Sequence, residues 1–197
     1  ERRGHELYYK KYFKAYTIEE LLYRDYFYCK DIKKPPYAYA SVREKNDEIS
    51  RIIEVTFSKE YENNLNDKLI FDVMDLPHLL TVLGGVLLHA SYIAINGEAI
   101  LFVAPKGIGK STQANLWNKY RGAEIINGDR VYVRKVKSLW MAHGVPYSGT
   151  SGICKNKSYP IKAIIFISQG TNNEIQKANK LDSCKLLLKE ASYNTWD

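Results

Sequence analysis

Cysteine is scarce in this sequence, and the spacing of the few that occur excludes two classes of protein. The 197 residues hold three, Cys29, Cys154 and Cys184, and no two of them form a C-x-x-C pair. Neither a disulfide framework nor a cysteine zinc site fits this spacing. We therefore expect reduced thiols and a cytoplasmic location.

Long hydrophobic runs are lacking as well. The most apolar stretch, Leu79 to Ile95, is shorter than a membrane span and is interrupted by Gly84-Gly85. It predicts the end of a helix followed by a buried strand, so we expect no membrane partner. The chain also contains no internal repeat and no low-complexity segment.

Acidic residues are outnumbered by basic ones. The net charge is +7 and the isoelectric point is near 9.1, which suits a polyanionic ligand or an acidic partner. The basic residues are scattered and form no stripe, so nucleic acid is not expected as a partner. With 45% hydrophobic residues, the chain is long enough for one globular domain with a smaller companion.

Residues 1–62 predict a small, tyrosine-rich α+β region. Many of the 16 tyrosines of the chain lie here. They fit the faces of a sheet, with their hydroxyl groups in contact with solvent, while a platform for stacking bases is the alternative. Thr17-Ile18-Glu19-Glu20 has the pattern of a capping box and predicts a short helix through Tyr23. Strands are predicted at residues 8–16, 37–42 and 52–57.

Residues 63–197 predict an α/β core that begins with a helix over residues 63–83, broken or kinked at Pro77. Asn96-Gly97 is a strong signal for a two-residue hairpin. The strands and helices expected around and after it cover residues 86–95, 98–103, 113–120, 123–127, 131–133, 139–142, 161–168 and 181–193.

The most informative stretch is a glycine loop at residues 104–112, Ala-Pro-Lys-Gly-Ile-Gly-Lys-Ser-Thr. An apolar strand precedes it and a helical segment follows it, which is the context of a phosphate-binding P-loop. Ala104 replaces the first glycine of G-x-x-x-x-G-K-[ST], and the rest of the pattern is intact. The sequence therefore predicts a nucleotide-phosphate site, with a structural turn as the alternative.

In such a loop the backbone N–H groups and the helix N-terminus attract phosphate oxygens. Lys110 is expected to reach the β- and γ-phosphates, and the Ser111 hydroxyl is expected to ligate Mg²⁺. The predicted nucleotide-binding residues are Lys106, Gly107, Ile108, Gly109, Lys110, Ser111 and Thr112.

A P-loop also needs a carboxylate for the metal or for the proton. Asp129 is the best candidate because it closes the apolar strand Ile125-Ile126, where a Walker-B-type acid belongs. An ordinary turn at Gly128-Asp129 is the alternative, and Glu124 is the next acid in line. Arg130 either contacts a phosphoryl oxygen or forms an ion pair.

His89 lies in the apolar sequence Leu87-Leu88-His89-Ala90. The hairpin at Asn96-Gly97 is expected to pair its strand with the strand before the glycine loop. His89 and Ala104 are then about equally far from the turn, which predicts an imidazole near the phosphates and close to Asp129. A satisfied core histidine is the alternative.

Together these motifs resemble the HPr kinase/phosphorylase-like group of P-loop kinases, which shares its nucleotide-binding core with phosphoenolpyruvate carboxykinase. The resemblance covers about residues 65–188. It is greatest to the bacterial HPr-kinase-like proteins of peptide-modification gene neighbourhoods, including lasso-peptide kinases. The matching motifs are Leu88-His89-Ala90-Ser91, Asn96-Gly97, residues 104–112, Asn127-Gly128-Asp129-Arg130 and residues 144–149.

The resemblance implies an α/β P-loop core with a mixed sheet, ATP and Mg²⁺ as cofactors, and metal ligation by Ser111 and Asp129. Its catalytic residues would be Asp129, His89, Lys110 and Arg130. Lys106 stands where relatives have a small residue. HPr kinases carry paired acids where this chain has Asp129 alone, so phosphorylation of HPr and its reversal are not implied. Relatives continue beyond Asp197, so we expect a C-terminally truncated core.

We predict an ATP-dependent kinase that transfers the γ-phosphoryl group to a Ser or Thr hydroxyl of a peptide or protein. The loop over residues 144–160 would line the acceptor side. Two alternatives stay open, a small-molecule kinase and a nucleotide-binding adaptor without transfer activity. Homo-oligomer formation is also left open.

Overall fold

The computed structural model describes residues 9–18, 21–29, 38–45, 51–65, 70–71, 74 and 76–192. The chain divides into two compact units, Glu1–Leu76 with Trp196–Asp197 and Pro77–Thr195. A functional division at residues 62/63 stays a prediction. Among the described helices, none is long and apolar enough to cross a membrane.

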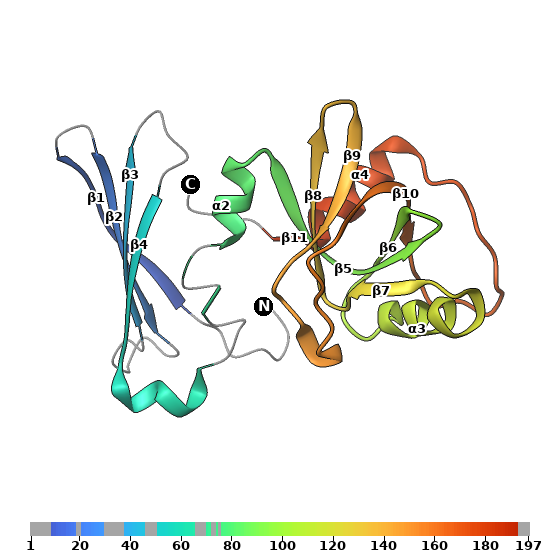
Figure 1. Ribbon diagram of the computed structural model, residues 1–197, viewed down its shortest axis with the longest axis horizontal. Helices are drawn as coiled ribbons and strands as arrows, with labels where there is room; N and C mark the ends of the chain where they lie inside the picture. Colours follow the sequence, from blue (N-terminus) through green and yellow to red (C-terminus); the bar gives the residue numbers. More distant parts are fainter. Residues whose placement is uncertain are drawn as a thin grey trace. The chain divides into compact units, whose positions relative to one another are not determined.

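The first unit contains an antiparallel sheet in the strand order β1-β2-β3-β4 (Figure 1). The strands predicted at residues 8–16, 37–42 and 52–57 are confirmed where the structure describes them. A 3₁₀ helix, η1 (Lys59–Asn64), follows the sheet. The strands are β1 (Tyr9–Ile18), β2 (Leu21–Cys29), β3 (Ala38–Lys45) and β4 (Arg51–Phe57).

The helix predicted from the capping box at Thr17 is wrong. Thr17 ends β1 with Ile18 and pairs with Leu22, while Ile18 pairs with Leu21 across a hairpin. Residues from Leu21 to Cys29 are rich in aromatic side chains, which favour strands and gain cross-strand partners. Sheet pairing therefore overrides the local capping signal.

The second unit is α/β, and its described strands form one mixed seven-stranded sheet. The helix predicted over residues 63–83 is interrupted, because Met74 lies in a turn between helical residues 70–71 and α2 (Leu76–Val82). The break predicted at Pro77 is thus found just before it, and Pro77 is the second residue of α2, where proline is tolerated. The other predicted elements are confirmed within a few residues at their ends. They are β5 (Gly85–Ile95), β6 (Glu98–Val103), α3 (Lys110–Arg121), β7 (Glu124–Asn127), β8 (Arg130–Val136), β9 (Leu139–Gly144), β10 (Ser158–Phe166) and α4 (Lys180–Glu190). Two short elements were not predicted. They are the 3₁₀ helix η2 (Gly149–Ser151), within the predicted loop, and strand β11 (Ala191–Ser192), within the predicted last helix.

The strand pairing of this unit closes on itself, in the order β5-β6-β10-β9-β8 and back to β5. Two long strands make the closure. The first half of β5 pairs with β8 and its second half with β6, while β10 passes from β9 to β6. Strands β7 and β11 add to β5 outside this ring.

The core follows the two-residue period of the strands. One set of side chains on β5 and β6, with Leu88, Tyr92 and Leu101 among them, packs with β8, β9, β10 and Leu187 of α4. The alternate side chains, including Ile93 and Phe102, pack against Ala114 and Trp117 of α3. Helix α3 therefore lies alongside β5, β6 and β7 (Figure 1).

The hairpin predicted at Asn96-Gly97 is confirmed. Both residues have positive φ angles, 51° and 77°, as a type I′ turn requires. Ala90 pairs with Val103, so His89 and Ala104 come next in register on the two arms. The turn thus brings His89 to the end of the sheet from which the glycine loop leaves.

A side chain at Gly85 is expected to destabilise the fold, because Tyr132 lies close to it. A Cβ at Gly85 would lie 2.4 Å from Tyr132 Cε2 and 2.6 Å from the Val133 oxygen. The ring cannot easily withdraw, because the Tyr132 hydroxyl donates to the carbonyls of Leu80 and Leu83. Gly85→Ala should therefore lower the free energy of unfolding by about 1–3 kcal/mol in urea denaturation.

The matched control is Gly170→Ala, whose Cβ would approach no atom closer than 3.7 Å. This variant should unfold like the parent. Equal effects of the two changes would contradict the packing described here.

Candidate functional site

Strand β5 is bordered at two consecutive residues by the end of one partner strand and the start of another, which lie on its opposite edges. His89 is the last residue paired with β8, opposite Arg130, and Ala90 is the first paired with β6, opposite Val103. The N–H of Ala90 also donates to the carbonyl of Asp129 at 3.0 Å. The glycine loop after β6 and the bend before β8 therefore lie beside neighbouring residues of β5, one on each edge of the strand.

The glycine loop between β6 and α3 presents free backbone donors. Gly107 and Gly109 have φ angles of 86° and 123°, which side chains rarely adopt, and open space lies beside both. Within the described part of the chain, the N–H groups of residues 109–112 donate to no protein acceptor. The start of α3 is therefore suited to bind an anion.

Lys110 lies at the base of this loop. Its side chain is buried, with 7% of the residue exposed, and its Nζ donates to the carbonyls of Ala104 at 2.6 Å and Pro105 at 3.2 Å. Burial lowers the pKa of Lys110, and the carboxylates of Glu190 and Asp129 oppose this shift. The ammonium group is thus held by loop carbonyls, next to exposed Ser111 and Thr112.

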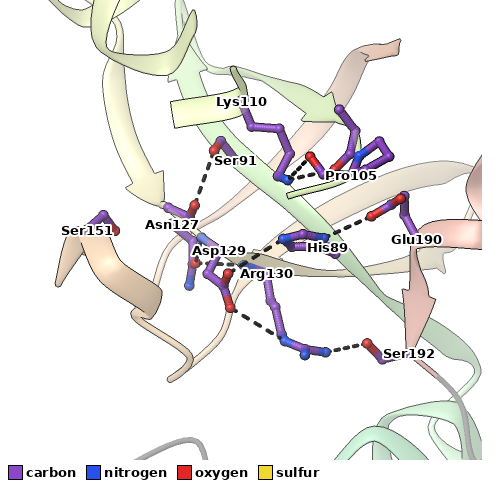
Figure 2. Close-up of polar contacts among 12 residues, drawn as sticks. His89, Ser91, Pro105, Lys110, Asn127, Asp129, Arg130, Ser151, Glu190 and Ser192 are labelled. Atoms are coloured by element: carbon purple, nitrogen blue, oxygen red, sulfur yellow. Dashed lines mark hydrogen bonds and ion pairs between the residues drawn. The ribbon is translucent and has the colours of Figure 1, made fainter. Parts of the chain in front are cut away.

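A rigid bend presents Asp129. Asn127 is fully buried, and its Oδ1 accepts from the N–H groups of Asp129 at 3.0 Å and Arg130 at 3.1 Å. Its Nδ2 donates to the Val145 carbonyl. The Ser91 hydroxyl, which lies beside this bend in Figure 2, donates to the Gly128 carbonyl. The side chain of Asn127 therefore fixes the turn that carries the carboxylate.

The segment from Gly144 to Gly152 packs directly on this bend. A Cβ on Gly149 would lie 2.6 Å from Asp129 Cβ, and one on Gly128 would lie 2.0 Å from Ser151 Oγ. The predicted acceptor-side loop therefore does reach Asp129. Its role toward an acceptor stays a prediction.

His89 joins two carboxylates. Its Nδ1 is 2.8 Å from Glu190 Oε2, and its Nε2 is 3.8 Å from Asp129 Oδ1 (Figure 2). Burial lowers the pKa of His89, the positive charge of Lys110 adds to this, and the hydrogen bond to Glu190 opposes it. The imidazole is therefore biased toward its neutral form.

Arg130 flanks Asp129 on the other side. Its Nε is 3.6 Å from Asp129 Oδ2, and its guanidinium group lies over the Tyr147 ring at 5.0 Å. The same guanidinium donates to the Ser192 hydroxyl. Of the two roles expected for Arg130, the structure shows the ion pair, and phosphoryl contact stays a prediction.

The structure thus brings together His89, Asp129 and Arg130, with the charge of Lys110 close enough to affect His89. Glu124 instead forms ion pairs with Lys155 and Lys157 at 2.8 Å, and their hydrogen bonds lower its pKa. In the described ranges, no group of three or more His, Cys, Asp or Glu side chains forms a metal site.

Two residues of this cluster, Glu190 and Ser192, were not predicted from the sequence. They lie at the end of α4 and in β11, within the helical pattern over residues 181–193. No local motif marks them. Their place is set by the pairing of Ala191 with Leu88, about 100 residues earlier in the chain.

Comparison with known proteins gives a family match and weak similarity to solved structures. Residues 68–197 match the family model described as SynChlorMet cassette protein ScmC. No curated protein matches the chain. A solved structure, the Hpr(Ser) kinase/phosphatase from Coxiella burnetii, is similar with a TM-score of 0.36 and 13% identity. The match covers 48% of this chain and 66% of that one, slightly under two thirds of its length.

The contact of Gly149 with Asp129 predicts a difference between two glycines of the same loop. Gly149 and Gly152 have φ angles of 56° and 67°, so alanine at either position should cost about 1–2 kcal/mol of unfolding free energy. Only at Gly149 would the added Cβ also overlap Asp129. Chemical denaturation should show the greater loss for Gly149→Ala, and equal losses would contradict this packing.

Proposed function

The chain belongs to the ScmC family of SynChlorMet cassette proteins, and we propose that it is an ATP-dependent kinase. The group transferred would be the γ-phosphoryl group, and the acceptor would be a Ser or Thr hydroxyl of a peptide or protein. One observation carries the proposal. A loop with free N–H groups and a buried lysine meets a carboxylate and an imidazole at the level of His89 and Ala90 of β5.

Phosphate binding follows from the loop geometry. The free N–H groups at the start of α3 would donate to phosphate oxygens, and the helix dipole favours their negative charge. Lys110 Nζ would exchange the Ala104 and Pro105 carbonyls for phosphate oxygens. A charge-assisted bond to phosphate is stronger than the bond to a neutral carbonyl that it replaces.

The donor atoms also fit Mg²⁺. The hydroxyl of Ser111 and the carboxylate of Asp129 are hard oxygen ligands, and MgATP sites in proteins use one or two carboxylates together with substrate phosphates. Ser111 is exposed in the first turn of α3, and Asp129 keeps 30% of its side chain accessible. When bound, the ion would neutralise charge on the transferred phosphoryl group.

The transfer needs an oriented hydroxyl. The acceptor oxygen would form a bond to the γ-phosphorus, the bond from that phosphorus to the ADP oxygen would break, and the single hydroxyl proton would pass to one adjacent base, either Asp129 or His89. Asp129 is fixed for this task by Asn127 and Gly149. The resemblance to peptide-modifying kinases supports a peptide acceptor.

Removing the lysine amine tests phosphate binding. Lys110→Ala should reduce phosphoryl transfer by at least about 10²-fold and weaken ATP binding, because the charge on the loop is lost. Lys119→Ala, at the exposed end of the same helix, should leave both unchanged. The readouts are calorimetric ATP binding and mass-spectrometric detection of phosphorylated peptides. Normal turnover by Lys110→Ala would rule out the proposed kinase site.

Metal dependence tests the two oxygen ligands. Ser111→Ala and Asp129→Asn should each raise the Mg²⁺ concentration needed for half-maximal activity, since each removes a hard donor or weakens it. Glu98→Gln, an exposed acid paired with Lys162, is the matched control. Unchanged metal dependence of Asp129→Asn would place the ligand elsewhere, with Glu124 as the next candidate.

A further inference from the structure

Glu190 is delivered to His89 by the fold itself. It is the last residue of α4, and the following strand β11 pairs with β5 through Ala191 opposite Leu88. Its side chain is 13% exposed, and its Oε2 lies 2.8 Å from His89 Nδ1. A largely buried carboxylate held by backbone pairing is a fixed partner, unlike a mobile surface ion pair.

This partner decides which nitrogen of His89 carries the proton. A neutral imidazole has one N–H, and an ionised carboxylate only accepts hydrogen bonds. In the contact at 2.8 Å, Nδ1 must therefore be the donor. Nε2 is left with a lone pair on the side that faces Asp129.

The separation between His89 and Asp129 agrees with this tautomer. Nε2 and Asp129 Oδ1 are 3.8 Å apart, which is too long for a hydrogen bond. Both atoms are acceptors, so neither can donate to the other. A hydroxyl group has a proton to donate. It can therefore form a hydrogen bond with either His89 Nε2 or Asp129 Oδ1, which these two atoms cannot form with each other.

We propose that Glu190 is a positioning residue that fixes the Nδ1–H tautomer of His89, so that Nε2 accepts a hydrogen bond from the acceptor hydroxyl beside Asp129. The role toward the hydroxyl rests on the proposed kinase function, whereas the tautomer does not. The bend carries a single acid, Asp129, for two tasks. With this tautomer Asp129 can ligate Mg²⁺ while His89 orients the hydroxyl.

The end of α4 and strand β11 also hold Arg130, the second side chain beside Asp129. Ser192, two residues after Glu190, accepts a hydrogen bond from Arg130. The end of α4 and β11 thus contact the residue on each side of the carboxylate. The two-residue strand β11 paired with β5 holds both contacts at this level.

The tautomer can be measured on the protein without nucleotide. Long-range ¹H–¹⁵N correlation spectra distinguish Nδ1–H from Nε2–H imidazoles, and they are recorded at a pH where His89 is neutral. The parent and Glu174→Gln, which removes an exposed acid elsewhere, should both show Nδ1–H. Glu190→Met keeps the side-chain length and replaces the carboxylate with a weakly accepting thioether, so it should shift His89 toward Nε2–H. Glu190→Gln offers an amide oxygen and should restore part of the parent signal.

Kinetics give the second readout. Glu190→Met should lower kcat by about 10- to 100-fold with little change in the KM for ATP, the usual effect of losing a partner that orients a histidine. Glu190→Gln should recover part of kcat. If Glu190 had only a structural role, Glu190→Met would lower stability without a selective loss of kcat, and Glu190→Gln would not recover kcat.

Either of two results would overturn the proposal, an Nε2–H tautomer in the parent or an unchanged tautomer in Glu190→Met. The parent spectrum decides even if the variant does not fold. An Nδ1–H tautomer together with no phosphoryl transfer by the parent would refute the kinase proposal and leave the orientation of His89 by Glu190 standing.

Discussion

The candidate site depends on one feature of the backbone, the register of β5 with the strands on its two edges at His89 and Ala90. At this level β6 ends in the glycine loop, β8 begins at Arg130, and β11 brings in Glu190. The sheet closes on itself, so none of these strands can slip without disturbing the others. The positions of the chemical groups are therefore consequences of hydrogen-bond register more than of side-chain contacts.

The charges of the site residues balance one another. Lys110 and Arg130 face the carboxylates of Asp129 and Glu190, and burial biases His89 toward its neutral form. Lys110 is satisfied by loop carbonyls, which a phosphate can replace at little cost. The site is thus stable without a ligand and still keeps a cation and free N–H groups available for an anion.

Local sequence signals predicted most strands and helices of the core, and they predicted His89, Asp129 and Arg130 of the site. Asn96-Gly97 predicted the hairpin register, and that register correctly placed His89 near Asp129. Glu190 could not be predicted, because its place depends on the pairing of β11 with a distant segment of β5. The capping box at Thr17 failed for the related reason that strand pairing outweighs a local preference.

The most direct test of this account is a crystal structure with Mg²⁺ and a non-hydrolysable ATP analogue. The account predicts the γ-phosphate at the N-terminus of α3, with Lys110 Nζ moved from the Ala104 carbonyl to a phosphate oxygen. It also predicts Mg²⁺ in contact with Ser111 and Asp129. A nucleotide bound elsewhere, with Lys110 still bonded to Ala104 and Pro105, would contradict it.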